Sequence, residues 1–157
     1  MHTQKSQNGF TLIEAALAVA IIGILGAVAW PLYQSQSLKN SRTSAISALA
    51  QLELEVRQCY SNRGGYDCCN TLDGVLANVL GASSPNTADS KYSVTYAATN
   101  ADATITNACK RSQGFTITAT PINNQTNDTC ALFSIDETGQ RIARDSSSNL
   151  KPSCWGD

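Results

Sequence analysis

The chain has 157 residues and a formal net charge of −1 at pH 7, with 11 lysines and arginines against 12 aspartates and glutamates. This length allows one domain with a modest core, and the near-neutral charge excludes a field of one sign that would attract nucleic acid or an anionic membrane surface. The only histidine is His2 and no Cys-x-x-Cys pair occurs, so we expect no metal site and no cofactor.

The first predicted element is a hydrophobic helix. Residues 15–33 carry no charge, and as a helix they would span about 28 Å, close to the roughly 30 Å hydrocarbon core of a bilayer. A cleaved secretory signal and an ordinary single-pass anchor are the alternatives. A secretory signal needs small residues after its apolar run, whereas this run ends in the bulky sequence Trp30-Pro31-Leu32-Tyr33. Cleavage at that end is therefore not expected.

One carboxylate, Glu14, stands at the start of the apolar run. An acid at mid-membrane costs about 2.5 to 3.5 kcal/mol on insertion scales, and less toward the ends of the span. An intramembrane carboxylate therefore indicates a functional role, with a partner that compensates its charge. The alternative is that Glu14 lies at the level of the lipid headgroups, where its cost is small.

The residues around Glu14 carry a family resemblance. The segment Gly9-Phe10-Thr11-Leu12-Ile13-Glu14, followed by the uncharged helix, resembles the class III signal of type IV prepilins. The resemblance implies that a prepilin peptidase cleaves between Gly9 and Phe10 and methylates the new N-terminus. It divides the chain into a leader (1–9), a transmembrane and filament-core helix (10–36) and a globular head (37–157). It also implies that Glu14 pairs with the N-terminal amine of a neighbouring subunit.

The helix is expected to continue to about Asn62, because Ser44 to Tyr60 shows helical periodicity without a breaker. One apolar stripe should pack on a sheet, and a second should contact neighbouring helices in a filament, scattered exposed residues being the alternative interpretation. The first stripe is Ala45, Leu49, Leu52, Val56 and Cys59, and the second is Ile46, Ala50 and Leu54. Pro31 removes a backbone hydrogen bond, so we expect a kink or local unwinding between Gly26 and Pro31.

The head is expected to begin where Arg63-Gly64-Gly65-Tyr66 breaks the helix. A short helix is predicted over Leu72 to Leu80. Alternation of β-branched and aromatic residues then predicts four strands, at Lys91 to Thr99, Gly114 to Pro121, Cys130 to Ile135 and Arg141 to Arg144. The fold class is thus α+β. The order resembles the pilin fold, in which a long helix, half in the membrane and half amphipathic, packs on a small antiparallel sheet with a disulfide-closed C-terminal loop.

All six cysteines follow the hydrophobic segment, which suits a head exported to an oxidising compartment. The second half of the chain, from Phe115 to Trp155, resembles PilE-type minor pilins. This resemblance implies a disulfide between Cys130 and Cys154. The other four cysteines can pair in several ways, but adjacent Cys68 and Cys69 would form a strained ring. We favour the pairs Cys59 with Cys69 and Cys68 with Cys109.

The mature chain offers no histidine, nucleophile elbow or phosphate-binding glycine loop, so no enzymatic activity is expected. The predicted function is that of a structural subunit of a bacterial type IV pilus, a minor pilin by resemblance, which supports adhesion, twitching motility or DNA uptake. Its expected partners are other pilins, the prepilin peptidase and the inner-membrane assembly machinery. We expect the helix in the inner membrane and the head in the periplasm before assembly, and both in the extracellular pilus afterwards.

Two alternative functions stay open. In the first, the head binds DNA or a host surface through basic residues, although such residues scattered among acids more often form a solvated face. The candidates are Lys110, Arg111, Arg141, Arg144 and Lys151. In the second, the chain is a pseudopilin of type II secretion, a class that shares the leader, the glutamate and the helix but more often lacks a cysteine-stapled C-terminal loop.

Overall fold

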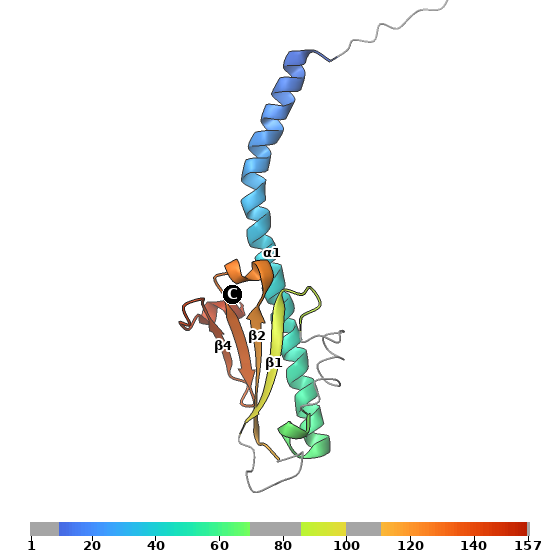
Figure 1. The fold of residues 1–157 in the computed structure, drawn as a ribbon, viewed down its shortest axis with the longest axis vertical. Helices are drawn as coiled ribbons and strands as arrows, with labels where there is room; N and C mark the ends of the chain where they lie inside the picture. Colours follow the sequence, from blue (N-terminus) through green and yellow to red (C-terminus); the bar gives the residue numbers. More distant parts are fainter. Residues whose placement is uncertain (1–9, 70–85, 100–110, 157) are drawn as a thin grey trace, which may run out of the picture. The chain divides into compact units, whose positions relative to one another are not determined.

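The computed structural model describes residues 10–69, 86–99 and 111–156. In these ranges the chain forms one long helix, four strands and three short 3₁₀ turns (Figure 1). The helix is α1 (Leu12–Arg63), and the strands are β1 (Tyr92–Thr99), β2 (Gly114–Pro121), β3 (Leu132–Asp136) and β4 (Arg141–Arg144). The turns are η1 (Tyr66–Cys69), η2 (Asn123–Asn127) and η3 (Pro152–Trp155). The helix predicted over Leu72 to Leu80 lies outside the described residues.

The chain divides into two units, residues 1–37 and 38–157. In the first unit, α1 is helical through Gly26 and Pro31 without a break, so the local unwinding that we expected there is not present in this structure. Proline removes one N–H donor, while the turns on either side keep their own hydrogen bonds. One carbonyl just beyond the proline, that of Leu32, also accepts the hydroxyl of Ser35 at 2.9 Å.

The second unit contains the rest of α1 and an antiparallel sheet in the order β1-β2-β3-β4, so each strand pairs with the next along the chain. β1 and β2 pair over their full length, with Tyr92 opposite Pro121. β2 and β4 have the predicted bounds, whereas β1 starts one residue late. β3 starts at Leu132 rather than Cys130, because the N–H of Cys130 donates to the Asp128 carboxylate (3.2 Å).

The core of this unit lies between α1 and one face of the sheet (Figure 1). Four of the five residues of the predicted helix stripe are buried, since Ala45, Leu49, Leu52 and Val56 are each at most 2% exposed, and the fifth, Cys59, is half-buried. Alternate residues of the strands face them, as the two-residue period of a strand requires: Tyr92, Val94, Phe115, Ile117, Phe133 and Ile135. Burying one large apolar side chain contributes about 1.5 to 3 kcal/mol, so each large side chain of this layer adds an amount of this order to the stability of the head.

The second apolar stripe is shorter than predicted. Leu54 is 69% exposed, but Ile46 packs against the core and Ala50 is half-buried. A helix turns by about 100° per residue, so Ile46, which follows buried Ala45, lies at the edge of the buried face. Contact of this stripe with neighbouring helices stays a prediction, and Leu54 is the large side chain available for it.

The C-terminal turns of α1 are attached to the sheet by Arg57. Its Nη2 atom donates to the carbonyl oxygen of Glu137, in the turn between β3 and β4, and to the carboxylate of Glu53, both at 2.8 Å. The helix ends at Arg63, one residue beyond the prediction. Gly64 then takes a φ of +78°, a conformation that favours glycine, and its N–H donates to the carbonyl of Tyr60 at 2.7 Å.

Candidate functional site

At the N-terminal end of α1, Thr11 and Glu14 bond to each other. The Glu14 carboxylate accepts the N–H of Thr11 (3.0 Å) and its hydroxyl (2.7 Å), and the N–H of Glu14 donates to the Thr11 hydroxyl (3.3 Å). This is a capping box, in which the first turn of a helix satisfies its own free N–H groups. Sequence reasoning assigned Glu14 to subunit pairing and missed this role, although the Thr-x-x-Glu spacing signals it.

The capping box adjoins the predicted processing site. Phe10 directly precedes Thr11 and is 90% exposed, while Gly9 lies outside the described residues. Because Glu14 bonds to Thr11, its carboxylate lies at the N-terminal end of the helix rather than on the side of the apolar run. The predicted cleavage would free the amine of Phe10 at this same end.

The side chains of residues 10–37 are exposed in the single chain. They include many large apolar ones, such as Ile13 (77%), Ile22 (68%), Leu25 (64%) and Trp30 (65%). By length and composition α1 is able to cross a membrane. An apolar surface of this length requires lipid or other protein to cover it, so this segment is the first candidate interaction surface.

The C-terminal loop is attached to the sheet covalently. Cys130 and Cys154, the pair implied by the resemblance, are joined by a disulfide and are 2% and 5% exposed. The ring of Trp155 meets the ring of Phe133 edge-on, with centroids 5.6 Å apart, and Arg141 Cζ lies 5.6 Å from the Trp155 centroid. The disulfide and these ring contacts together hold the last residues of the described chain against β3 and β4.

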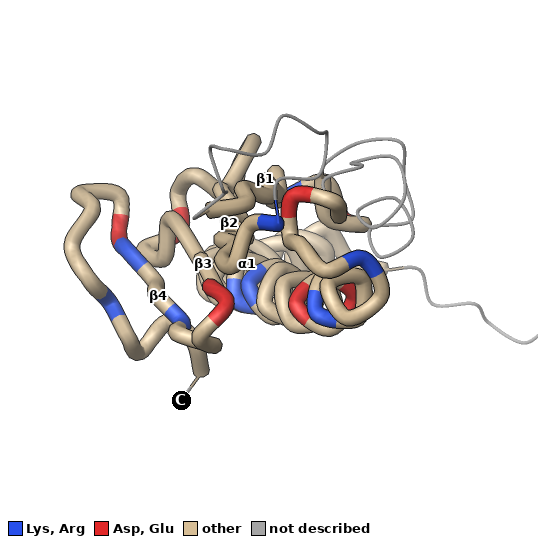
Figure 2. Tube along the Cα trace, turned by 90° about the horizontal axis from the view of Figure 1, so that it is seen from below, with Lys and Arg blue, Asp and Glu red and all other residues tan. Residues whose placement is uncertain are grey.

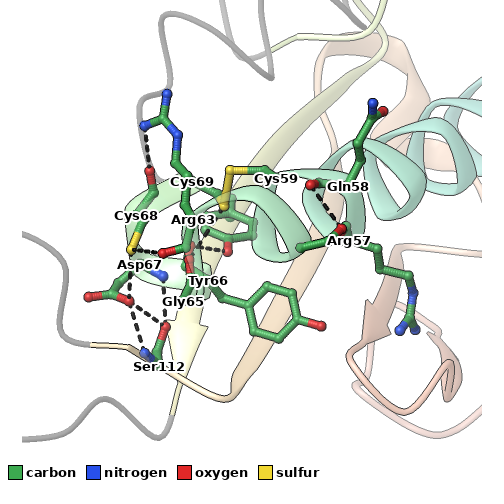
Figure 3. Close-up of a disulfide and its surroundings, with 12 residues drawn as sticks. Arg57, Gln58, Cys59, Arg63, Gly65, Tyr66, Asp67, Cys68, Cys69 and Ser112 are labelled. Atoms are coloured by element: carbon green, nitrogen blue, oxygen red, sulfur yellow. Dashed lines mark hydrogen bonds between the residues drawn. A yellow bond between two sulfur atoms is a disulfide. The ribbon is translucent and has the colours of Figure 1, made fainter.

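A second disulfide joins Cys59, in the last turns of α1, to Cys69 at the end of η1 (Figure 3). This is one of the two pairs that we favoured. Cys68 also takes part in a disulfide, and Cys109, the partner we predicted for it, lies outside the described residues. Tyr66, between the two ends of this loop, is stacked on Tyr60 with centroids 4.3 Å apart. The chain reversal after α1 is thus held by covalent and aromatic contacts.

The predicted basic patch is divided by the fold. Arg141 and Arg144 belong to β4, an edge strand of the sheet, and Lys151 precedes η3 (Figure 2). Arg111 packs instead against Gly65, just past the end of α1, and Lys110 lies outside the described residues. The sequence does not show this division, because residues distant along the chain are brought together or separated by strand order.

Asp145 lies next to the basic residues of β4. Its carboxylate accepts the N–H groups of Asn149 and Ser147, each at 2.9 Å. The hydrogen bond from Asn149 is the main cause that lowers the pKa of Asp145, and the charge of Lys151 acts in the same direction. The Asp145 carboxylate therefore weakens the field of Lys151. Within residues 10–69, 86–99 and 111–156, no three His, Cys, Asp or Glu side chains gather as metal ligands.

Two family models match the chain. The model described as "Type IV minor pilin ComP, DNA uptake sequence receptor" matches residues 31–134, more than half of the chain. The model described as "Prokaryotic N-terminal methylation motif" matches residues 4–30. The second match contains the Gly9 to Glu14 segment, and the first contains the second half of α1, β1, β2 and most of β3.

The chain is also similar to individual proteins. It is 36% identical to the fimbrial protein EcpC of Eikenella corrodens over 78 residues, which are 50% of this chain and 51% of that protein. It is 38% identical to the type IV major pilin protein PilE1 of Neisseria gonorrhoeae over 86 residues, 55% of this chain and 48% of that protein. A solved type IV pilin from Shewanella oneidensis is 27% identical, with a TM-score of 0.47, over 76% of this chain and 99% of that chain. The chain thus spans about half the length of the two named relatives.

Proposed function

Since the chain belongs to the type IV minor pilin family of ComP, the DNA uptake sequence receptor, we propose that it is a minor subunit of a bacterial type IV pilus. In this role it supports pilus assembly and, through the pilus, adhesion, twitching motility or DNA uptake. The family match favours the pilus over a type II secretion pseudopilin. One observation carries the proposal: residues 10–37 expose an apolar surface with a single carboxylate, Glu14, at its start.

This surface needs a cover in each state of the subunit. Before assembly, lipid of the inner membrane covers residues 10–36, and the head, residues 37–157, lies in the periplasm. In the pilus the helices of other subunits take the place of lipid, and the inner-membrane assembly machinery transfers the subunit from one setting to the other. The exposed large side chains along α1 support this proposal, because both covers are apolar.

The proposal includes processing of the N-terminus. Residues 1–9 form a leader, and a prepilin peptidase cleaves between Gly9 and Phe10 and methylates the new amine of Phe10. The match to the N-terminal methylation motif over residues 4–30 supports this step. Cleavage also creates a positive charge at the helix end where Thr11 holds the Glu14 carboxylate.

We assign Glu14 to pairing with the N-terminal amine of a neighbouring subunit. Each of these charges is costly alone in an apolar setting, and both are compensated when two subunits are staggered by the right step. The pair therefore favours the filament over free subunits and selects one register. Pro31 is the place where we expect α1 to kink or unwind in the assembled pilus.

The experiment is mass spectrometry of surface fibres sheared from cells. The N-terminal peptide is expected to begin with N-methylated Phe10. Glu14→Gln, which keeps the shape of the side chain but removes its charge, should be cleaved normally and enter fibres poorly. Gly9→Val serves as the uncleaved control. Recovery of the chain uncut and confined to the inner membrane would contradict the proposal.

A second candidate function is DNA binding by the head, favoured by the description of the matched family. The residues that support it are Arg141, Arg144 and Lys151, which lie on or next to edge strand β4 (Figure 2). Contacts of lysine and arginine with phosphates supply affinity that falls with salt. Because the whole chain is close to neutral, such affinity would depend on these few cations, and Arg141 and Arg144, three residues apart on one strand, point to opposite faces of the sheet.

DNA binding is tested with the processed full chain in detergent and a DNA duplex over rising salt concentration. Arg144→Gln and Lys151→Gln should each weaken binding and reduce the slope of log K against log salt by about 1. Lys39→Gln, at an exposed position of α1, is the matched control. Absence of a salt-dependent complex at micromolar protein, or equal loss in the control, would rule out this candidate.

A further inference from the structure

The connection between β2 and β3, residues 122–131, carries two Asn-x-Thr triplets in succession. They are Asn124-Gln125-Thr126 and Asn127-Asp128-Thr129, and the chain contains no other Asn-x-Thr or Asn-x-Ser triplet. In an exported protein this triplet is the acceptor of N-linked glycans where it lies on a surface loop. The connection contains η2 and runs beside α1 (Figure 1).

Both triplets have their first and third residues at the surface and their middle residue inside the head. The exposed residues are Asn124, Thr126, Asn127 and Thr129. The buried residues are Gln125, which is 1% exposed, and Asp128, which is 4% exposed. Each triplet therefore presents to solvent the amide that receives a sugar and the hydroxyl that defines the acceptor.

The two buried side chains hold the connection on the helix and the sheet. The amide nitrogen of Gln125 donates to the Tyr92 hydroxyl (3.0 Å) and to the carbonyl oxygen of Leu38 (3.1 Å). The Asp128 carboxylate accepts Nε of Arg42 at 2.6 Å. Because these bonds are made by the middle residues, they fix the backbone and leave the acceptor side chains outside.

The first triplet is closed by a hydrogen bond of its own turn. Asn124 lies within η2, and the Thr126 hydroxyl donates to the carbonyl oxygen of Asn123 at 2.8 Å. An enzyme that binds this hydroxyl must first break that bond, which has a cost. The first triplet is therefore the poorer acceptor in the folded head.

The second triplet is open. Asn127 is the last residue of η2, and Asp128 after it is extended, with φ −73° and ψ 145°. The Thr129 hydroxyl oxygen accepts Nη2 of Arg42 at 3.3 Å. Within residues 10–69, 86–99 and 111–156, this hydroxyl donates no hydrogen bond and the Asn127 amide takes part in none. Both acceptor groups are thus available without a change in the fold.

We propose that Asn127 is an N-glycosylation site of the folded head, selected over Asn124 by the open backbone at Asp128. The reaction is transfer of a glycan from a lipid diphosphate donor by an oligosaccharyltransferase. The amide nitrogen of Asn127 bonds to the anomeric carbon of the sugar, the bond from that carbon to the diphosphate oxygen breaks, and the lipid diphosphate leaves. The amide releases one proton, and no oxidant or reductant takes part.

The place of the connection suits a donor that is carried by a membrane lipid. Gln125 contacts the carbonyl of Leu38, and Leu38 follows by two residues the segment 10–36 that we propose to lie in the inner membrane. At 1.5 Å per residue this is about 3 Å of helix. In this respect the inference rests on the proposed function, which places the connection at the periplasmic surface of the membrane.

The test is mass spectrometry of the processed full chain from membranes of the cells that make it. Trypsin cuts after Arg111 and Arg141, so one peptide, residues 112–141, contains both triplets. Electron-transfer fragmentation should locate a glycan on Asn127, with an occupancy about fivefold or more above that of Asn124, the ratio that one hydrogen bond provides. An unmodified peptide, equal or higher occupancy at Asn124, or sugar on a hydroxyl would overturn the inference.

Variants of the exposed residues make the result specific. Asn127→Gln and Thr129→Ala should abolish the added mass, whereas Thr129→Ser keeps the hydroxyl and should retain it. Asn124→Gln, in the neighbouring triplet, is the matched control and should leave the glycan in place. The Cys130 to Cys154 disulfide, measured without reduction, reports whether the head is folded. A glycan that persists in folded Thr129→Ala would contradict the role of the triplet.

The site and the pilus are tested by separate results. A chain that carries the glycan on Asn127 but is absent from sheared fibres would contradict the proposed function and leave the site standing. A chain that enters fibres with N-methylated Phe10 and an unmodified Asn127 would contradict the glycosylation site alone.

Discussion

Asp67 and Ser112, whose positions differ by 45, bond to each other in both directions. The Asp67 carboxylate accepts the N–H of Ser112 at 2.9 Å and its hydroxyl at 3.0 Å, and the Ser112 hydroxyl oxygen accepts the N–H of Asp67 at 2.7 Å. The carbonyl of Ser112 also accepts the N–H of Tyr66 at 3.0 Å. These bonds join η1 to the residues just before β2, beside the Cys59 to Cys69 disulfide (Figure 3).

Ser112→Ala is expected to destabilise the head by about 1 to 3 kcal/mol, because it removes the acceptor of the Asp67 N–H and leaves that group poorly satisfied in a partly buried setting. Urea unfolding of the full chain in detergent, followed by tryptophan fluorescence, measures the change. Ser146→Ala, at an exposed position, is the control and should stay within about 0.5 kcal/mol. Equal effects of the two variants would contradict the structural role of Ser112.

Gly65→Ala is expected to cost about 1 to 3 kcal/mol through overpacking. A β-carbon at Gly65 would lie 2.6 Å from the Cα atom of Arg111 and 2.8 Å from Oδ1 of Asp67. Gly64→Asn is the neighbouring control: its β-carbon meets no atom within 4 Å, and asparagine tolerates the positive φ of that position. Thermal unfolding of both variants measures the difference in stability. A larger loss of stability in Gly64→Asn than in Gly65→Ala would show that the close approach at Gly65 does not determine the cost.

Replacing Cys130 and Cys154 together by alanine should lower the stability of the head by about 3 kcal/mol in the chain-entropy model, for a sequence separation of 24. The disulfide between Cys59 and Cys69 closes a shorter loop, with a separation of 10. The double alanine variant of these two cysteines should therefore lose somewhat less stability. Urea midpoints of the two variants test this order. A greater loss at the shorter loop would mean that strain or local packing, rather than loop entropy, dominates.

Asp145 should titrate below the ordinary aspartate pKa of 3.8, because its carboxylate accepts the N–H of Asn149. A lowered folded pKa means that this group contributes to stability above the unfolded pKa, and that the contribution is lost as pH falls through the lowered value. Nuclear magnetic resonance of the Asp145 carboxyl carbon, with the Ser147 and Asn149 amides, should give a midpoint below 3.8. Asp145→Asn should abolish the amide transition, and a midpoint at or above 3.8 would contradict the assignment.

Thr11→Val keeps the shape of the side chain and removes both hydroxyl hydrogen bonds to Glu14. Loss of an N-cap costs about 1 kcal/mol of helix stability, and here it also frees the Glu14 carboxylate from the hydroxyl that holds it at the helix end. Recovery in fibres should therefore fall, whereas Thr11→Ser should stay near the unmodified chain. Quantitative mass spectrometry of sheared fibres measures recovery, and the mass of the N-terminal peptide verifies that cleavage is unaffected. Equal recovery of Thr11→Val and Thr11→Ser would show that the capping box does not contribute to assembly.

Much of the fold was predictable from local patterns. The end of α1, its buried stripe and the bounds of β2 and β4 follow from the 3.6-residue and 2-residue periods and from glycine breakers, which are properties of neighbouring residues. The resemblance of the Gly9 to Glu14 segment to a prepilin signal could also be recognised from the sequence, because its residues are adjacent. The Thr11 to Glu14 capping box was missed, yet its spacing of three residues is also a local signal.

The hydrogen bonds and ion pairs between distant segments were not predictable. The bond from Gln125 to Leu38 spans a separation of 87, and that from Asp67 to Ser112 spans 45. Periodicity indicates which face of α1 is buried, but the partner of each buried polar group depends on the path over the helix of the segment between β2 and β3. The sequence therefore specifies the elements and their apolar faces. It does not specify that Arg42 pairs with Asp128, because the chain has several acids and several bases and only the folded sheet brings these two together in a buried setting.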